Sequence, residues 1–302
     1  MKTKSSYFLK SVTLGWSAEL EIDETEYKAI TNARRILSVA LSIEEKYDLV
    51  LGNFMDFEKE LLLLTMDKIT DRRFDYERAY ATHAVINRRL ANFVISGKHY
   101  TELIAGQAAK CAGNVAEVEA TIEALKRKHY DGCLDYRFME VLRGHLSHSG
   151  AGVHSVGNPD KWMRNENGEA TSFVFNINVY SLKAQLAENS GFKRPVLREL
   201  PEKIDLKKAV RSYLGAISDI QMEVRKLTKN STSSARDLIK SYIDKYSKAN
   251  NGKSFAVSAH GLGEEPVMLF LDWDDVRIGL AKKNQSVSNM NRRHVSSAIE
   301  SL

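Results

Sequence analysis

The sequence has very little cysteine. Only Cys111 and Cys133 occur among 302 residues, and neither has a second cysteine at the spacing of a metal-binding or redox-active pair. A disulfide framework of the kind that stabilises small secreted proteins is therefore not expected. We expect two reduced, partly buried thiols in a cytoplasmic protein.

Long hydrophobic runs are also missing. Near the N-terminus, Lys10 and Ser11 interrupt the apolar residues too early for the hydrophobic region of a signal peptide. No later segment approaches the uninterrupted apolar length that a membrane span needs. The sequence predicts a protein without a membrane partner.

A strong charge of one sign is the third absence. The formal net charge is +5, and the excess of basic residues lies in the C-terminal half. Such a mild imbalance can favour a polyanionic partner, but it falls short of the basic patch of a dedicated nucleic-acid-binding protein. A plain solvated surface is the alternative interpretation. The hydrophobic content of 43% is enough for a substantial core.

Apolar residues recur every three to four positions through most of residues 1–150. The stretch DETE at 23–26 is typical of a capping box, in which Asp23 and Glu26 satisfy the free amides of a first helical turn. Short connections between successive helices favour antiparallel neighbours. The pattern predicts helices at about 23–41, 43–69, 74–96, 99–109, 115–129 and 134–147.

The pattern changes after Gly150. Residues 151–180 are rich in turn formers, and NENGE at 165–169 separates an aromatic segment from an alternating run, which predicts a β-hairpin. Residues 7–22 are consistent with a short hairpin or an extended arm. Further helices are expected at 181–188, 205–228 and 234–247, the last with a capping box of Ser234 and Asp237, and short strands at 255–259 and 266–273.

These elements predict a mainly α fold. We expect a helical bundle over residues 1–150, and over 151–302 a helical extension with short β-hairpin elements and a polar tail. Helices of this kind bury an apolar stripe against one another.

The stretch EVLRGHLSHSG at 140–150 carries the candidate site. Arg143 presents fixed, permanently charged donors that suit phosphate oxygens. His148 titrates near neutrality, so it can move a proton when a ribose 2′-hydroxyl attacks its own phosphodiester. Five positions on an ideal helix separate the two side-chain directions by about 140°. Gly144 and Gly150 favour a helix that loosens or ends near His148, where the pair can converge.

Other interpretations of the same stretch stay open. It can be a structural helix end, with Glu140 pairing with Arg143 on the helix surface. A metal site would use His145, His148 and His154, joined by Cys133 or Asp135, although no established zinc motif accompanies them. On the third predicted helix, Asn87 either faces inward and braces the Arg143 region or belongs to a solvated face.

An arginine followed four to six residues later by a histidine, near a helix end of an all-helical bundle, resembles the HEPN superfamily. The match is Arg143-Gly-His-Leu-Ser-His148, within a bundle at roughly residues 24–150. It departs from the usual pattern at Gly144, because a polar residue commonly follows the arginine in HEPN nucleases.

The resemblance implies a metal-independent endoribonuclease that needs no cofactor and forms a 2′,3′-cyclic phosphate, in a bacterial toxin or phage-defence setting. Arg143 and His148 would be catalytic, and His145 and Asn87 would contact RNA. A homodimer and an antitoxin or other protein partner are also implied. The alternative is a non-catalytic module that keeps the bundle and binds nucleic acid or protein.

Overall fold

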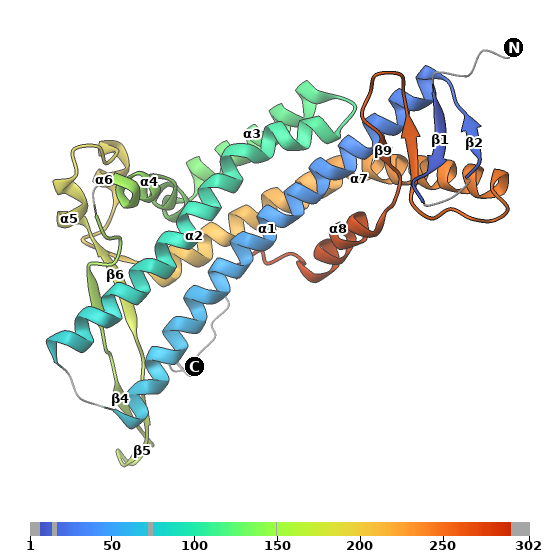
Figure 1. The fold of residues 1–302 in the computed structure, drawn as a ribbon. Coiled ribbons are helices and arrows are strands. Elements are labelled where there is room, and N and C mark those ends of the chain that lie inside the picture. Colours follow the sequence, from blue (N-terminus) through green and yellow to red (C-terminus); the bar gives the residue numbers. More distant parts are fainter. Residues whose placement is uncertain (1–6, 14–16, 72–74, 149, 291–302) are drawn as a thin grey trace, which may run out of the picture. The chain divides into compact units, whose positions relative to one another are not determined.

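The computed structural model describes residues 7–13, 17–71, 75–148 and 150–290. The described chain is mainly helical, with long helices packed together and small antiparallel sheets that lie mostly in the C-terminal half (Figure 1). This confirms the predicted fold class. The end of the polar tail, residues 291–302, lies outside the described residues.

The helices and strands follow one another along the chain as labelled in Figure 1. Their bounds are β1 Phe8–Ser11, β2 Glu19–Glu21, α1 Glu24–Thr70, α2 Tyr76–Cys111, α3 Val115–Gly132, α4 Leu134–His148, β3 Ser155–Gly157, β4 Lys161–Arg164, β5 Ala170–Val174, β6 Asn178–Leu182, α5 Lys183–Glu188, α6 Arg194–Glu199, β7 Lys203–Asp205, α7 Leu206–Ala249, β8 Val257–His260, β9 Val267–Met268 and α8 Asp272–Lys283.

The three longest helices are each a fusion of two predicted ones. α1 runs through 47 residues without a break at Ser42, α2 continues across Gly97, and α7 continues through the polar run at 229–233. The prediction of a capping box at Ser234 was therefore wrong. The capping box at Asp23 is confirmed: the Glu26 amide donates to the Asp23 carboxylate at 2.7 Å, and the Asp23 amide donates back to Glu26 at 2.9 Å.

The chain forms two compact units, and segments from both sides of residue 150 contribute to each. Unit 1 comprises residues 1–45, 104–122 and 223–285, and unit 2 comprises 46–103, 123–222 and 286–302. Each of α1, α2 and α7 is divided, with one part in unit 1 and the other part in unit 2.

Unit 1 contains an antiparallel sheet with the strand order β2-β1-β8-β9. The hairpin expected within residues 7–22 is confirmed, since Leu9 pairs with Leu20 across β1 and β2. Strands β8 and β9, expected from the C-terminal sequence, also pair with each other. Apolar side chains of the sheet and of two helices form one core cluster, which includes Leu9, Ile30, Leu37, Ile239, Tyr246 and Ala259.

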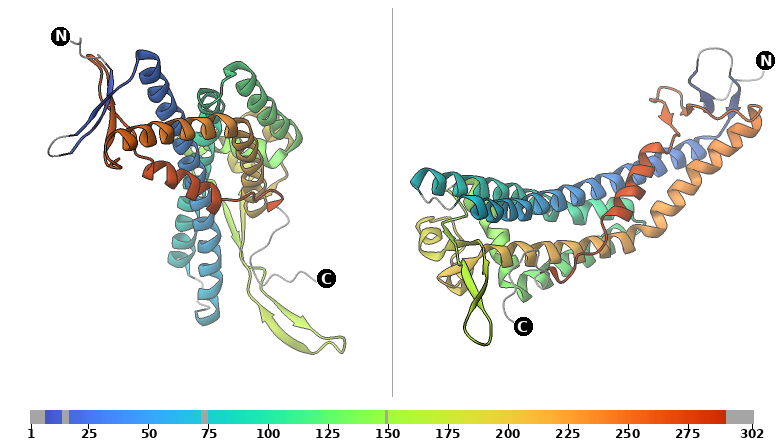
Figure 2. Two further views of the ribbon diagram at one scale, coloured as in Figure 1. Left: turned by 90° about the vertical axis from the view of Figure 1, so that its right-hand side faces the viewer. Right: turned by 90° about the horizontal axis from the view of Figure 1, so that it is seen from below.

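The helices of unit 2 are held by aromatic contacts. α1 and α2 run side by side and antiparallel (Figures 1 and 2), and Phe54 meets Phe93 at a ring-centroid separation of 6.1 Å. Phe93 also packs edge-on against Tyr213 of α7 at 5.9 Å. Gly97 permits this close approach, because a Cβ atom there would lie 2.5 Å from the Tyr213 ring. Gly97 is thus a packing position inside α2 and not a helix end.

Two small β elements complete unit 2. β4 and β5 form the hairpin expected around NENGE, with Trp162 opposite Phe173, and it projects from the rest of the unit (Figure 2). The second half of the predicted hairpin strand does not continue β5. It forms β6, which pairs with β3 and β7 in a separate three-stranded sheet.

Candidate functional site

Helix α4 positions the Arg143–His148 motif in unit 2. Phe138, Met139 and Leu142 of this helix are fully buried, so the register of α4 against its neighbours is fixed by close packing. The helix ends at His148, as expected, and it keeps helical geometry across Gly144.

Arg143 is half-buried and makes no hydrogen bond or ion pair with the described residues. It differs in this from every other buried or half-buried arginine that the structure describes. A carboxylate or a backbone carbonyl accepts a hydrogen bond from each of Arg34, Arg78, Arg89, Arg137, Arg211, Arg225, Arg236 and Arg277. The Arg143 guanidinium is thus left with all its donors for a ligand.

The expected pairing of Glu140 with Arg143 was wrong. The Glu140 carboxylate instead accepts hydrogen bonds from Lys98 at 2.6 Å, from the Tyr213 hydroxyl at 2.6 Å and from Thr101 at 3.1 Å. These partners lie on α2 and α7, so Glu140 faces the interior of unit 2 rather than the surface of α4. Burial, together with the nearby Glu140 charge, raises the pKa of Tyr213 well above its ordinary value, which keeps the hydroxyl protonated as a donor.

Positions 143 and 148 lie on different faces of α4. In the unbroken helix they are about 140° apart around the axis and about 7.5 Å apart along it. The side chain of His148 lies outside the described part of the structure. Helix geometry thus sends the two motif residues to different faces within one copy of the chain.

His145 is buried, and both of its ring nitrogens are engaged. The amide nitrogen of Asn189 donates to Nδ1 at 3.1 Å, and Nε2 donates to the carbonyl of Ala151 at 3.1 Å. This pattern fits a neutral imidazole with its proton on Nε2. The ring also meets Phe192 edge-on at 6.2 Å. His145 therefore holds the chain that follows α4 in place.

Asn87 supports the same segment from α2. Its side-chain oxygen accepts from the amides of Gly152 at 2.9 Å and Val153 at 2.8 Å, and its side-chain nitrogen donates to the carbonyls of His83 and Val153. Asn87 faces inward, and its hydrogen-bonding capacity is used by backbone groups. The structure thus brings Asn87 and His145, both predicted RNA contacts, to residues 151–153.

His145 and His154 do not form a metal site with other described residues. His154 accepts a hydrogen bond at Nδ1 from the Leu182 amide at 2.9 Å, which occupies the nitrogen that faces β6. Burial lowers the pKa of His154, and the neighbouring His145 lowers it further. Within the described chain, no group of three histidine, cysteine or acidic side chains is placed to hold a metal ion.

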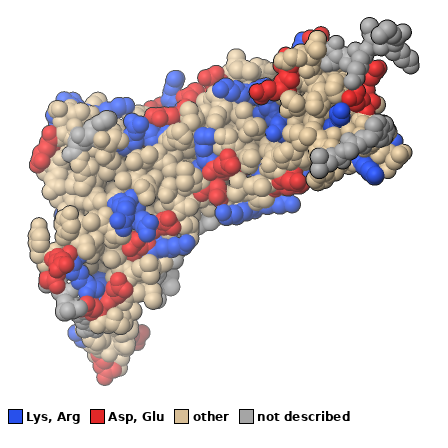
Figure 3. All heavy atoms as spheres, in the orientation of Figure 1, with Lys and Arg blue, Asp and Glu red and all other residues tan. Residues whose placement is uncertain are grey.

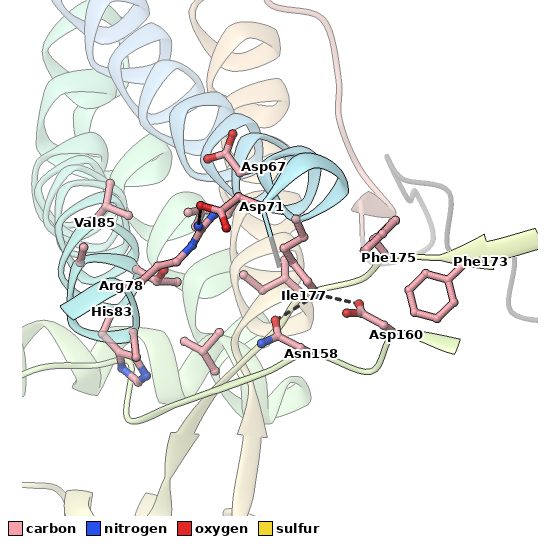
Figure 4. Close-up of a pocket in the computed structure, with 16 residues that line it drawn as sticks. Asp67, Asp71, Arg78, His83, Val85, Asn158, Asp160, Phe173, Phe175 and Ile177 are labelled. Atoms are coloured by element: carbon pink, nitrogen blue, oxygen red, sulfur yellow. Dashed lines mark hydrogen bonds and ion pairs between the residues drawn. The ribbon is translucent and has the colours of Figure 1, made fainter. Parts of the chain in front are cut away.

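A pocket of about 610 Å³ lies elsewhere in unit 2 and was not found from the sequence. Its walls come from the end of α1, the start of α2, the chain after β3 and the end of the β4–β5 hairpin (Figure 4). Phe173, Phe175 and Ile177 line it from the hairpin side, and Arg78 and His83 from α2. These residues belong to no recognisable motif, and only the alternation of Phe173, Phe175 and Ile177 marks one wall in the sequence.

The surface charge is mixed. Figure 3 shows lysine and arginine side chains interspersed with aspartate and glutamate on the face that it draws. No helix of the described chain is long and apolar enough to cross a membrane. No family model matches the sequence, and no curated protein or solved structure is significantly similar to it.

Proposed function

We propose that the protein is a metal-independent endoribonuclease that uses Arg143 and His148 at the end of α4. The observation that carries this proposal is the half-buried residue Arg143, which alone among the buried or half-buried arginines of the described chain has no polar partner among the described residues. A phosphate at this position would accept charge-assisted hydrogen bonds from the guanidinium.

The chemistry follows from the two side chains. His148 removes the proton of a ribose 2′-hydroxyl, whose oxygen attacks the adjacent phosphorus, and the bond to the 5′-oxygen breaks as that oxygen takes up a proton. Arg143 stabilises the negative charge that develops on the phosphate oxygens. The products are a 2′,3′-cyclic phosphate and a 5′-hydroxyl. Because the two side chains leave α4 about 140° apart, a homodimer would complete each site by combining Arg143 of one copy with His148 of its partner.

Cleavage of mixed RNA in the presence of EDTA tests the proposal. Wild-type protein should release fragments with cyclic phosphate ends, and both His148→Ala and Arg143→Ala should lose at least about a hundredfold in rate, a typical loss for an acid–base or charge-stabilising group. The matched control is His99→Ala, which removes an exposed imidazole from α2 and should cleave like the wild type. Equal cleavage by all four proteins would overturn the proposal, as would no cleavage by any of them.

A second candidate function is RNA binding without cleavage. It is favoured by the engagement of His145 and Asn87 with backbone groups, which leaves Arg143 as the predicted contact residue with free donors in the described chain. In this case wild-type protein retains labelled RNA in a salt-dependent manner, and Arg143→Ala weakens retention while the RNA stays intact.

A further inference from the structure

Apolar and polar side chains line the pocket in unit 2 in equal number. Phe173 and Phe175 meet edge-to-face, with ring centroids 4.9 Å apart and planes at 81°. Val85, Val156 and Ile177 contribute branched side chains to the remaining walls. A volume of about 610 Å³ lies within the range of small-molecule sites, which combine apolar walls with a few polar groups.

Two ion pairs engage four of the five charged side chains of the pocket, and the fifth, Asp67, is exposed and forms no ion pair with the described residues. The Lys68 ammonium donates to Asp160 at 2.6 Å, to the side chain of Asn158 at 3.2 Å and to the carbonyl of Asn176 at 2.8 Å, which uses its three donors. Across the pocket, Arg78 forms an ion pair with Asp71 (Figure 4). Because Lys68 and Arg78 are both neutralised by a carboxylate, the described lining offers no unpaired lysine or arginine to an anionic group.

Three polar side chains of the lining keep unused hydrogen-bonding groups. The Thr82 hydroxyl and the His83 ring make no hydrogen bond with the described residues, and the amide nitrogen of Asn158 is also without an acceptor there. Thr82 and His83 offer donors and acceptors from α2, and Asn158 does so from the chain after β3. A planar ring with polar edges can stack on a phenylalanine and satisfy these groups at the same time.

We propose that this pocket binds an uncharged planar aromatic ring with a hydrogen-bonding edge, of which a nucleobase is the best match. The ring stacks against Phe173 or Phe175, and its edge bonds to Thr82, His83 or Asn158. The site uses none of the residues proposed for RNA cleavage, and binding there does not depend on that activity.

Titration calorimetry of the full chain with adenosine tests the proposal. Ala81 lies at the pocket on α2, so Ala81→Trp should fill the space without removing a core contact. It should weaken adenosine binding by about tenfold or more, in line with the loss of one stacked base. Ala84→Trp adds the same ring at an exposed position of α2 that does not line the pocket, and it should change binding by less than about twofold.

The chemical class of the ligand is tested with matched probes. Adenosine and adenosine 5′-monophosphate should bind with similar affinity, whereas ribose 5-phosphate should not bind. Tight binding of ribose 5-phosphate would instead identify a phosphate site and overturn the proposal. Absence of adenosine binding, or an equal loss in Ala81→Trp and Ala84→Trp, would overturn it as well. Arg143→Ala should bind adenosine like the wild type, so failure of the cleavage proposal leaves this result unaffected.

Discussion

The interior of unit 2 and its pocket both contain polar side chains, and some of those at the pocket have no partner among the described residues. In the interior, Arg211 pairs with Glu58, and His145 and Asn87 hold the chain after α4. At the pocket, the side chains of Thr82 and His83 form no hydrogen bond with a described side chain or backbone group. The engaged groups stabilise the fold, and the unengaged groups are available to a ligand.

Arg143 belongs with the second class, although it lies on a helix of the interior. Its near neighbour in the sequence, His145, belongs with the first. The sequence motif suggests similar roles for Arg143 and His145. Their contacts in the structure differ, because His145 has hydrogen-bond partners and Arg143 has none among the described residues. The comparison therefore predicts that substituting an engaged side chain lowers the free energy of unfolding, whereas substituting an unengaged one leaves it nearly unchanged.

The largest expected difference is between two arginines. Arg211 is buried and donates to both oxygens of Glu58, at 2.7 and 2.8 Å. Arg211→Gln should lower the free energy of unfolding by about 3–5 kcal/mol, because it leaves a buried carboxylate without its partner. Arg143→Gln should change it by no more than about 0.5 kcal/mol. Urea unfolding measures both, and a large loss in Arg143→Gln would show that Arg143 has a structural partner.

A smaller difference is expected between two histidines. His145→Ala removes a buried ring that bonds to Ala151 and Asn189, and it should cost about 2–4 kcal/mol through the cavity and the lost hydrogen bonds. His83→Ala removes a ring that bonds to no described residue, and it should cost no more than about 0.5 kcal/mol. Equal losses in thermal unfolding experiments would contradict the division into engaged and unengaged groups.

Helix positions were predictable from the sequence because they depend on local pattern. The capping box at Asp23 and the apolar stripes identified every long helix. The predicted breaks failed where tertiary or side-chain contacts replace what a break would supply. Gly97 is required for the approach of Tyr213, and the hydroxyls of Thr228 and Thr232 donate to carbonyls one turn earlier, at 2.8 and 2.9 Å. Such residues discourage a helix in isolation but are accommodated inside a packed one.

The site was predictable only in part for a related reason. The inward orientation of Asn87 was one of two interpretations of its sequence, and contacts with Gly152 and Val153, more than sixty residues away, decide between them. The partner of Glu140 is Lys98, 42 positions earlier, and not the adjacent Arg143. The pocket joins segments near residues 64–85 and 156–177, which no local spacing connects.

The smallest expected effect is a dependence of stability on pH that is caused by protonation of His154. Burial lowers the pKa of His154 in the folded protein below the ordinary value of 6.5. A hydrogen bond to the Ala151 backbone raises the pKa, His145 and His83 lower it, and Glu188 raises it. As the pH falls below about 6.5, the unfolded chain therefore takes up a proton that the folded protein does not bind. The stability contributed by the neutral ring is fully present above this pH and is lost as the pH falls toward the folded-state pKa.

His154→Asn tests this dependence, because the asparagine side chain can still accept from the Leu182 amide near the position of Nδ1 but does not titrate. The decrease in melting temperature between pH 7.5 and pH 5.5 should be smaller in His154→Asn than in the wild type. Burial also lowers the pKa values of His129 and His260, so part of the decrease should remain. His99→Asn, at an exposed position of α2, serves as the matched control and should keep the wild-type decrease. An unchanged decrease in His154→Asn would mean that protonation of this ring is not coupled to folding.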